Sequence, residues 1–376
     1  MRILLWISRI IFGLVFIFSG FVKAIDPLGS TYKFQDYFLS FGLEWMFSLA
    51  LPLAIILSTL EFLIGVNVLL GIKMRLSALG GLLFMLFFTP LTLYVALFDP
   101  VPDCGCFGDA LIISNWQTFY KNIVFLAAAI FIFIKRKEIK PLWSERNDWY
   151  LSGVVALIGI LISVYCLRNL PIIDFRPWKV GNNVLELMTA EPEEADIYLI
   201  FENQQTGELA EYPATDYPWD DEEWNQLWKF KDQRREIIKP YVPAPIDDFA
   251  LYDEYGDDYT DSYLANPDYQ FLLVVYDLAG ANTKAFAKRI NPLAQAAEEQ
   301  GYSFVALTGS SFEAIDAFRH QHQTPYYFYQ ADGVKLKTII RSNPGLVLMK
   351  DGVVLGKWAH RNIPDFETIQ KEYMKE

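Results

Sequence analysis

The sequence Asp103-Cys104-Gly105-Cys106-Phe107-Gly108-Asp109 joins two strongly apolar runs and holds two of the three cysteines in this 376-residue chain. A Cys-x-Cys pair with glycine between the cysteines favours thiol chemistry or metal binding. The residues before this stretch, and those after it up to Arg168, have the composition of membrane helices. The residues beyond Arg168 have the composition of a water-soluble domain. We therefore predict a membrane half that carries the thiols, followed by a water-soluble half.

Five apolar runs have the length of about 20 residues that crosses a bilayer as a helix. They are Ile3–Val22, Trp45–Ile72, Leu76–Phe98, Trp116–Ile134 and Trp149–Leu167. No Ala-x-Ala-like cleavage site follows the first run, so we interpret it as a retained membrane helix and not a signal peptide. The polar and aromatic segment Pro27–Glu44 predicts a short surface helix.

The charges of the loops predict the orientation of these helices. Basic residues gather in two loops, at Lys73, Arg75, Lys135, Arg136, Lys137, Lys140 and Arg146, whereas the cysteine loop has only acidic ones. The positive-inside rule then places the N-terminus in the cytoplasm, and the cysteine loop and the C-terminal half outside. Cys166, at the outer end of the fifth run, falls on the same side as Cys104 and Cys106. Disulfides persist in such an oxidising compartment.

Two charged residues lie within the apolar runs. Arg9 is about two turns into the first run and Glu61 is near the middle of the second. Intramembrane charges are costly and usually pair or line a polar cavity, so we predict an Arg9–Glu61 pair. A structural pair that locks two helices is favoured over a proton or substrate path. Asn67 is expected to join helices by a hydrogen bond.

The formal net charge of −13 excludes the basic footprint of a nucleic-acid-binding protein. Beyond Pro243, buried strands and amphipathic helices alternate in the order β-α-β-α-β-β-α, which predicts an α/β domain with a mixed sheet. The strands are expected at Phe271–Tyr276, Ser303–Leu307, Gly345–Met349 and Val353–Trp358, the last two joined by the turn Asp351-Gly352. Ile197–Glu202 and Glu208–Pro213 predict a separate hairpin, and Asp220–Lys239 has a mixed pattern.

The C-terminal part resembles the thioredoxin fold from about Pro243 to the end. Ala244–Leu251 followed by Gly256 is similar to the entry hairpin of peroxiredoxin-like domains, and Asn343-Pro344-Gly345 to the cis-proline loop of thioredoxins. The resemblance implies a cis bond before Pro344. Active members carry Cys-x-x-Cys after the first central strand, but Asp277–Thr283 stands there without a cysteine. We therefore expect a redox-inactive domain that binds or holds a partner.

The membrane half resembles the DoxX/MauE family of bacterial redox-associated membrane proteins, over about residues 1–135. The resemblance rests on Gly13–Lys23, on Glu61 and on Cys104-Gly105-Cys106-Phe107-Gly108, which is typical of members annotated with methylamine utilisation. It implies a multi-pass protein of the bacterial cytoplasmic membrane that helps to form disulfides in an exported dehydrogenase subunit. The fifth span and the fused domain depart from the bare family, which leaves the thiol theme but weakens the link to methylamine metabolism.

These resemblances divide the chain into four parts. They are a DoxX/MauE-like transmembrane domain at 1–135, a cytoplasmic loop and fifth transmembrane helix at 136–168, an outer linker with a small extension at 169–242, and the thioredoxin-like domain at 243–376. The overall fold class is an all-α membrane bundle followed by an α/β domain.

The candidate catalytic residues are Cys104, Cys106 and Cys166. A disulfide across one intervening residue is strained and therefore easily reduced. The acids Asp103 and Asp109 are expected to raise the pKa of the thiols. Cys166 is either a third exchange partner or a small buried residue. Metal binding by the three cysteines lacks a four-ligand spacing, and an inert Cys104–Cys106 disulfide stays an alternative.

Three functions remain open from the sequence. The first is a membrane accessory for thiol–disulfide exchange whose partner is an exported client or another thiol-redox protein. The second is a non-enzymatic envelope scaffold with a structural Cys104–Cys106 disulfide. The third is a small-solute transporter that uses Arg9 and Glu61, which the lack of a repeat disfavours. No cofactor motif is evident, and the sequence gives no support for a quinone as electron acceptor.

Overall fold

The computed structural model describes residues 2–139 and 147–374 of the chain. The described residues include five helices that are long and apolar enough to cross a membrane. They are α1 (Arg2–Ile25), α3 (Ala50–Leu70, preceded by the 3-10 turn η1, Glu44–Leu49), α4 (Met74–Phe98), α5 (Asn115–Lys135) and α6 (Asp148–Arg168). The five predicted spans are thus confirmed as helices. Lys140 and Arg146, which support the predicted orientation, lie outside the described residues.

Helices α1 and α3 pack closely because glycines line their crossing. A Cβ atom on Gly20 would lie 2.4 Å from the backbone nitrogen of Phe62, and one on Gly65 would lie 2.6 Å from that of Ile17. Small residues allow membrane helices to approach to backbone contact. Asn67 on α3 donates a hydrogen bond to Ser152 on α6 at 3.2 Å, as the sequence predicts. These contacts fix the register of the helix bundle, residues 2–168.

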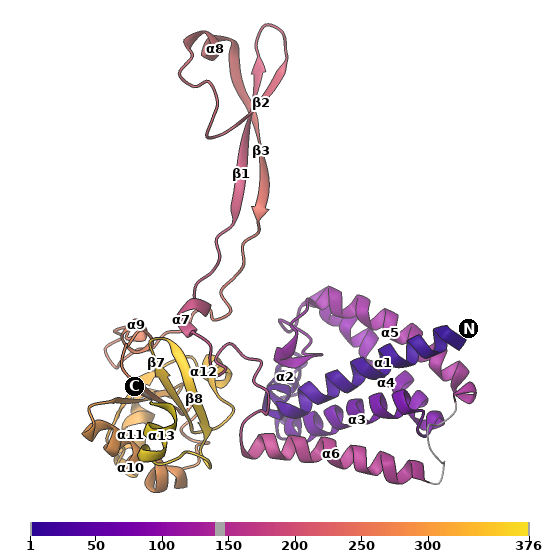
Figure 1. The fold of residues 1–376 in the computed structure, drawn as a ribbon, viewed down its shortest axis with the longest axis vertical. Coiled ribbons are helices and arrows are strands. Elements are labelled where there is room, and N and C mark those ends of the chain that lie inside the picture. Colours follow the sequence, from indigo (N-terminus) through magenta and orange to yellow (C-terminus); the bar gives the residue numbers. More distant parts are fainter. Residues whose placement is uncertain (1, 140–146, 375–376) are drawn as a thin grey trace.

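The segment between α1 and α3 forms helix α2 (Pro27–Ser40), which confirms the predicted short helix. Asp26 caps its N-terminus by accepting a hydrogen bond from the backbone nitrogen of Gly29. Helix α2 lies at the end of the bundle that faces the second half of the chain (Figure 1). The Cys104–Cys106 loop, with its short turn η2 (Gly108–Ala110), lies at the same end.

The second half contains a five-stranded mixed sheet in the order β6-β5-β4-β7-β8. Its strands are β4 (Gln270–Val274), β5 (Ser303–Thr308), β6 (Tyr327–Gln330), β7 (Gly345–Lys350) and β8 (Val353–Ala359). Strands β4, β5 and β6 are parallel to one another, whereas β7 is antiparallel to β4 and β8 to β7. The predicted element order is confirmed, with one additional strand, β6, and one additional helix, α12 (Gly333–Ile339).

Helices cover both faces of this sheet. Alternate residues of β4 point to opposite faces and therefore into two separate cores. Phe271 and Leu273 face a core built with α10 (Asn291–Glu299), α11 (Phe312–His322) and α13 (Phe366–Tyr373). Leu272 and Val274 face a second core that includes α12. The short π-helical turn η5 (Phe286–Ile290) leads into α10, and α9 (Thr260–Leu264) precedes β4. The hairpin expected near Tyr252 is reduced to a single bridge between Tyr252 and Asp258.

The segment that follows α6 is part of this second core. Trp178 is 1% exposed and packs edge-on against Phe249, with ring centroids 5.1 Å apart. Val184, at the start of the short helix α7 (Val184–Leu187), is also buried there. We call residues 170–188 and 243–374 the sheet domain. The connection from α6 is therefore anchored in that domain from Trp178 onward.

An extended arm, residues 189–242, projects away from both the helix bundle and the sheet domain (Figure 1). It is a three-stranded antiparallel sheet in the order β2-β1-β3, with β1 (Glu194–Asn203), β2 (Leu209–Pro213) and β3 (Trp228–Lys239). The predicted hairpin is confirmed as β1 and β2. The mixed segment Asp220–Lys239 resolves into α8 (Glu222–Leu227) and the exposed strand β3.

Candidate functional site

The two thiols of the cysteine loop lie in contact. The sulfur atoms of Cys104 and Cys106 are 3.1 Å apart, and both side chains are half-buried. Gly105 between them has a φ of +69°, in the left-handed region that favours glycine. The backbone nitrogen of Gly105 donates a 2.8 Å hydrogen bond to Asp103, which holds this tight turn. The loop is therefore shaped so that a small movement of the sulfur atoms would form or break a disulfide.

A buried polar cluster on α1 and α3 supports the loop from the membrane side. Lys23 Nζ lies 2.8 Å from both carboxylate oxygens of Glu61. Ser19 Oγ lies 2.9 Å from Glu61 Oε2 and 2.8 Å from the carbonyl oxygen of Cys106. All three residues are buried, with whole-residue exposures of 9% for Lys23, 8% for Ser19 and 3% for Glu61. The cluster therefore links an intramembrane ion pair directly to the backbone of the thiol loop.

The predicted Arg9–Glu61 pair is wrong. Arg9 instead donates hydrogen bonds to the carbonyl oxygens of Val68 and Leu69, at 3.3 and 3.1 Å. Because α1 and α3 are antiparallel, the glycine contacts that place Gly20 beside Ser58 and Phe62 also place Glu61 beside Ser19 and Lys23. Sequence analysis missed Lys23 as the partner, although the glycines that set this register were visible in the sequence.

Helix α2 covers the loop from the other side. Lys33 forms a 2.6 Å ion pair with Asp103, and the Tyr37 hydroxyl lies 3.4 Å from the carbonyl oxygen of Cys104. Burial raises the pKa of Tyr37, so this phenol stays protonated as a donor. These contacts explain why the loop is ordered although it lacks regular secondary structure.

The two thiols have opposite acidities. The hydrogen bond from Cys104 lowers the pKa of Cys106 to about 6, against the effect of burial and with help from the cations Lys121 and Lys23. The same hydrogen bond and burial raise the pKa of Cys104 well above its usual value. Asp103 and Asp109, which were expected to raise the pKa of the thiols, do not set its direction at Cys106, where the hydrogen bond from Cys104 prevails. A thiolate is the nucleophile in thiol–disulfide exchange, and a neighbouring thiol that donates a hydrogen bond stabilises it.

Cys166 lies apart from the other two cysteines. It is 3% exposed and packs against Val22 and Ile25 at the interface of α1 and α6. No sulfur contact joins it to Cys104 or Cys106 among the described residues. Its position fits the interpretation of a small buried residue, and the predicted role as a third exchange partner has no contact to support it. Among the same residues, no group of three His, Cys, Asp or Glu side chains is placed to hold a metal ion.

An apolar cavity of about 290 Å³ opens beside the thiols on the membrane side. Phenylalanines from four helices line it, together with leucines and Met85. These are Phe16, Phe34, Phe38, Phe41, Phe84, Phe87, Phe88 and Phe125, and Phe107 of the loop adds a ninth ring. Cys104, Cys106, Lys23 and Glu61 also line it and, with Ser19, form what we call its polar end. Lys33, Tyr37, Lys121 and Asn122 add further polar groups to the lining.

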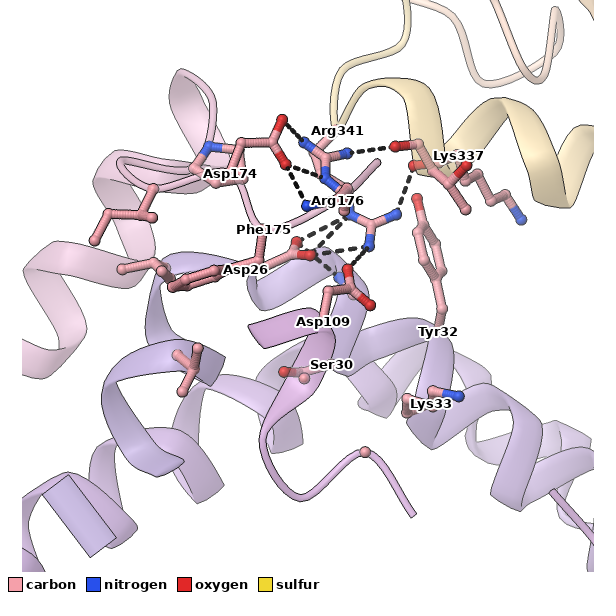
Figure 2. Close-up of a pocket in the computed structure, with 18 of the residues that line it drawn as sticks. Asp26, Ser30, Tyr32, Lys33, Asp109, Asp174, Phe175, Arg176, Lys337 and Arg341 are labelled. Carbon is pink, nitrogen blue, oxygen red and sulfur yellow. Dashed lines mark hydrogen bonds and ion pairs between the residues drawn. The ribbon is translucent and has the colours of Figure 1, made fainter. Parts of the chain in front are cut away.

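A second cavity of about 270 Å³ lies between the helix bundle and the sheet domain. Figure 2 shows its centre, where the Arg341 guanidinium meets two carboxylates of the helix bundle. Arg341 Nε lies 3.0 Å from both oxygens of Asp26, and Nη2 lies 3.2 Å from Asp109. The ring of Tyr32 stands beside Arg341 and Lys337, with centroid distances of 5.4 and 4.8 Å.

Acidities in this second cavity reflect the ion pairs. Burial raises the pKa of Asp26, but the Arg341 guanidinium outweighs it, so the net pKa lies below the usual value. Burial raises the pKa of Asp109, and the more distant Arg341 only partly offsets this. Asp174 holds Arg176 at 2.7 Å on the sheet-domain side (Figure 2). It also holds Lys357 at 2.7 Å. The second cavity is therefore a charged junction, unlike the apolar first one.

The cysteine loop separates the two cavities, because Gly105 lines both of them, as do Ser30 and Lys33 of α2. The sheet domain presents the end of β4 and the cis-proline loop to this junction. The Asn343–Pro344 peptide bond is cis, and Asn343 donates a 2.6 Å hydrogen bond to the carbonyl oxygen of Asp277. Asp277–Thr283, the segment without cysteines, is therefore adjacent to the loop that carries Arg341.

Of the two halves of the chain, only the membrane half matches a known protein family. No curated protein and no solved structure matches this chain. A family model does match: the description of that family is methylamine utilisation protein MauE, and the match spans residues 1–135. This range contains α1 to α5 and the cysteine loop. The thiol site, with its buried Lys23–Glu61 pair, thus lies inside the MauE-like part of the chain, whose described residues include five apolar helices.

Proposed function

We propose that this protein is a membrane accessory for thiol–disulfide exchange, in which Cys104 and Cys106 exchange a disulfide with an exported client. The observation that carries the proposal is the 3.1 Å contact between two sulfurs of which one is acidic. In the oxidised loop, a client thiolate attacks the sulfur of Cys104, and Cys106 leaves as the thiolate because the more acidic thiol is the better leaving group. A second client thiol then displaces Cys104, so the client gains a disulfide and the loop gains two thiols.

The sheet domain is proposed to be thioredoxin-like and redox-inactive. Its mixed sheet, its cis-proline loop and the position of Asp277–Thr283 support this assignment. In a thioredoxin the dithiol lies where β4 ends, and here that end faces the helix bundle through the hydrogen bond between Tyr276 and Tyr32. The domain thus directs its client-binding edge at thiols that the helix bundle supplies. We place the junction on the outer face of a bacterial cytoplasmic membrane, with a cytoplasmic N-terminus.

The test is to trap the mixed disulfide. With Cys106→Ser the loop disulfide cannot form, and Cys104 can join a client only by attacking a disulfide that the client already carries, which releases one client thiol. No Cys106 thiol is then left to cleave the mixed disulfide, so a Cys104–client adduct should accumulate in cells after acid quenching and maleimide blocking. With Cys104→Ser the adduct should be scarce, and Cys166→Ser should behave like the unchanged protein. Full function of a Cys104→Ser/Cys106→Ser double variant would refute the exchange function. Stable co-purification of a partner with that variant would favour the scaffold, in which the loop disulfide is structural.

A further inference from the structure

The apolar cavity beside the thiols has no role in client exchange, which takes place on the other side of the loop. Its volume of about 290 Å³ is at the lower end of the range for small-molecule sites, which is roughly 300–1,000 Å³. Nine phenylalanine rings line it, together with polar groups that include the two thiols. A flat ring that carries polar atoms matches such a site better than a flexible acyl chain does.

Two residues that line the cavity are also exposed at the outer surface of the helix bundle. Phe87 on α4 and Phe41 at the end of α2 line it, and they are 65% and 40% exposed. Both belong to the part of the chain that forms the helix bundle. A ligand dissolved in the membrane could therefore enter sideways, without crossing the charged junction beneath the sheet domain.

The polar end of the cavity is suited to a ligand that accepts electrons and protons. Two buried charged side chains, Lys23 and Glu61, line it with polar atoms 2.8 Å apart. The N–H donors of Lys23 are taken by Glu61 and Ser19, so its contribution to a ligand here is the field of a nearby cation, which favours negative charge on a carbonyl oxygen that is being reduced. Cys104 and Cys106 line the same end, so their electrons need no further carrier to reach a ligand there.

We infer that this cavity binds the ring of a membrane quinone, which reoxidises the Cys104–Cys106 pair. The inference rests on the proposed function and names its electron acceptor. In the reaction two S–H bonds break and one S–S bond forms. The two electrons and two protons convert the two quinone carbonyl groups into the hydroxyl groups of a quinol. Electrons would thus pass from client to loop on one side of Gly105 and from loop to quinone on the other.

The experiment uses the full chain in nanodiscs of quinone-free lipid, with decylubiquinone as the probe. The reduced protein should turn over one quinone per chain, seen as loss of quinone absorbance and as loss of two hydrogen masses from the loop peptide. Leu91→Trp fills the cavity and should slow this reaction by about tenfold or more, since even one methylene in an apolar pocket changes rates by that order. Ala54→Leu, a smaller filling of the same cavity, guards against misfolding of the first variant.

The matched control is Leu83→Trp, which places the same indole on the lipid-facing side of α4, outside the cavity. It should reduce quinone at the unchanged rate. A binding readout is independent of electron transfer: decylubiquinone retained by the Cys104→Ser/Cys106→Ser variant should be lost when Leu91→Trp is added.

The outcomes separate this inference from the proposed function. Oxidation of the loop by glutathione disulfide, without oxidation by quinone, overturns the inference and leaves thiol exchange intact. Equal quinone reduction by the filled and control variants also overturns it, since the site would lie elsewhere. Retention of a lipid acyl chain with no competition by decylubiquinone overturns it in the same way. A loop that no oxidant converts to a disulfide would refute both proposals.

Discussion

Arg341 and Asp26 connect the two halves of the chain across 315 positions of sequence. The guanidinium Nε lies 3.0 Å from each carboxylate oxygen, and the Arg341 side chain is 7% exposed. Asp26 also caps α2, the helix that covers the thiol loop, so the contact holds the sheet domain against the helix that shields the cysteines. The geometry predicts that access to the thiols depends on this ion pair.

Arg341→Ala should release the sheet domain from the helix bundle. Truncation of one partner in a buried, hydrogen-bonded charge pair costs about 2–5 kcal/mol, largely because the other charge stays unpaired. We expect a bulky polyethylene-glycol maleimide to label the loop cysteines at least several times faster, while the small reagent iodoacetamide changes little. Arg234→Ala, which removes an arginine from exposed ion pairs on the arm, is the control. Equal rates for both variants would show that Arg341 does not hold the domain.

The junction should weaken only in strong acid. Because the pKa of Asp26 is lowered in the docked state, its contribution is complete above the usual carboxyl pKa of about 3.9 and is lost as the pH falls through the docked value. Asp109 acts in the opposite sense: burial raises its pKa, so its protonation as the pH falls relieves a cost of docking. Hydrogen exchange of the 26–41 segment, corrected for intrinsic rates, should not rise from pH 7 to about 4 and should rise below that. In Asp26→Asn this acid limb should vanish.

The acidity of Cys106 should depend on Cys104 as a hydrogen-bond donor. Iodoacetamide should alkylate Cys106 with a pH midpoint of about 6. Cys104→Ala removes the donor and should move this midpoint upward, toward the usual thiol value of about 8.5. Cys104→Ser keeps a hydroxyl donor and should move it less. If the alanine and serine variants titrate alike, the hydrogen bond is not the principal cause of the lowered Cys106 pKa. The cations Lys121 and Lys23 would then have to lower it.

Loss of Lys23 should destabilise the helix bundle. Lys23→Met leaves the Glu61 carboxylate buried without its cation, at a cost of about 3–5 kcal/mol. Lys33→Met is the matched control, because its pair with Asp103 is partly exposed and contributes at most about 1 kcal/mol. Thermal unfolding in detergent should show a large fall in midpoint for the first variant only. Addition of Glu61→Leu to Lys23→Met should restore part of the loss; no recovery would mean that the carboxylate is not the source of the damage.

The glycine crossing of α1 and α3 gives a steric prediction. Gly20→Ala places a Cβ atom 2.4 Å from the Phe62 nitrogen, so the helices must separate, at a cost of roughly 1–3 kcal/mol. Gly153→Ala on α6 meets no atom within 4 Å and should leave the unfolding temperature unchanged. Because Ser19 and Lys23 flank Gly20, the same substitution should also increase alkylation of the loop. Unchanged stability of Gly20→Ala would mean that the crossing can relax without cost.

Composition and periodicity were sufficient for the broad architecture. Long apolar runs must be helices in a bilayer, since their backbone groups have no other partners there, and so the five spans were predicted closely. The sheet was predicted from buried β-branched and aromatic runs. Strand β6 was not predicted, because Tyr327–Gln330 is too short to show the alternation of buried and exposed residues that indicates a strand. Strand β3 was not predicted, because almost all of its side chains are exposed and its sequence is charged.

The site was predicted in part, for a different physical reason. The Cys-x-Cys spacing is local, so the thiol pair was visible in the sequence. The partner of Glu61 depends on helix register, which side-chain charges alone do not specify, and Arg9 was chosen where Lys23 is found. Arg341 and Asp26 form a contact between distant segments, and no local pattern of residues encodes such a contact. The apolar cavity likewise arises only when α1, α2, α3, α4 and α5 are assembled.

The anchoring of the sheet domain through Trp178 affects how a client would gain access to the thiols. A domain tethered by a short segment competes for the junction at an effective concentration fixed by the tether, and not by the abundance of the protein. Under the proposed function, a client that reaches the thiols from the junction would therefore compete with a neighbour whose local concentration is the same in a crowded and a sparse membrane. Exchange would then depend on the affinity and the concentration of the client, and not on how many copies of this chain lie nearby.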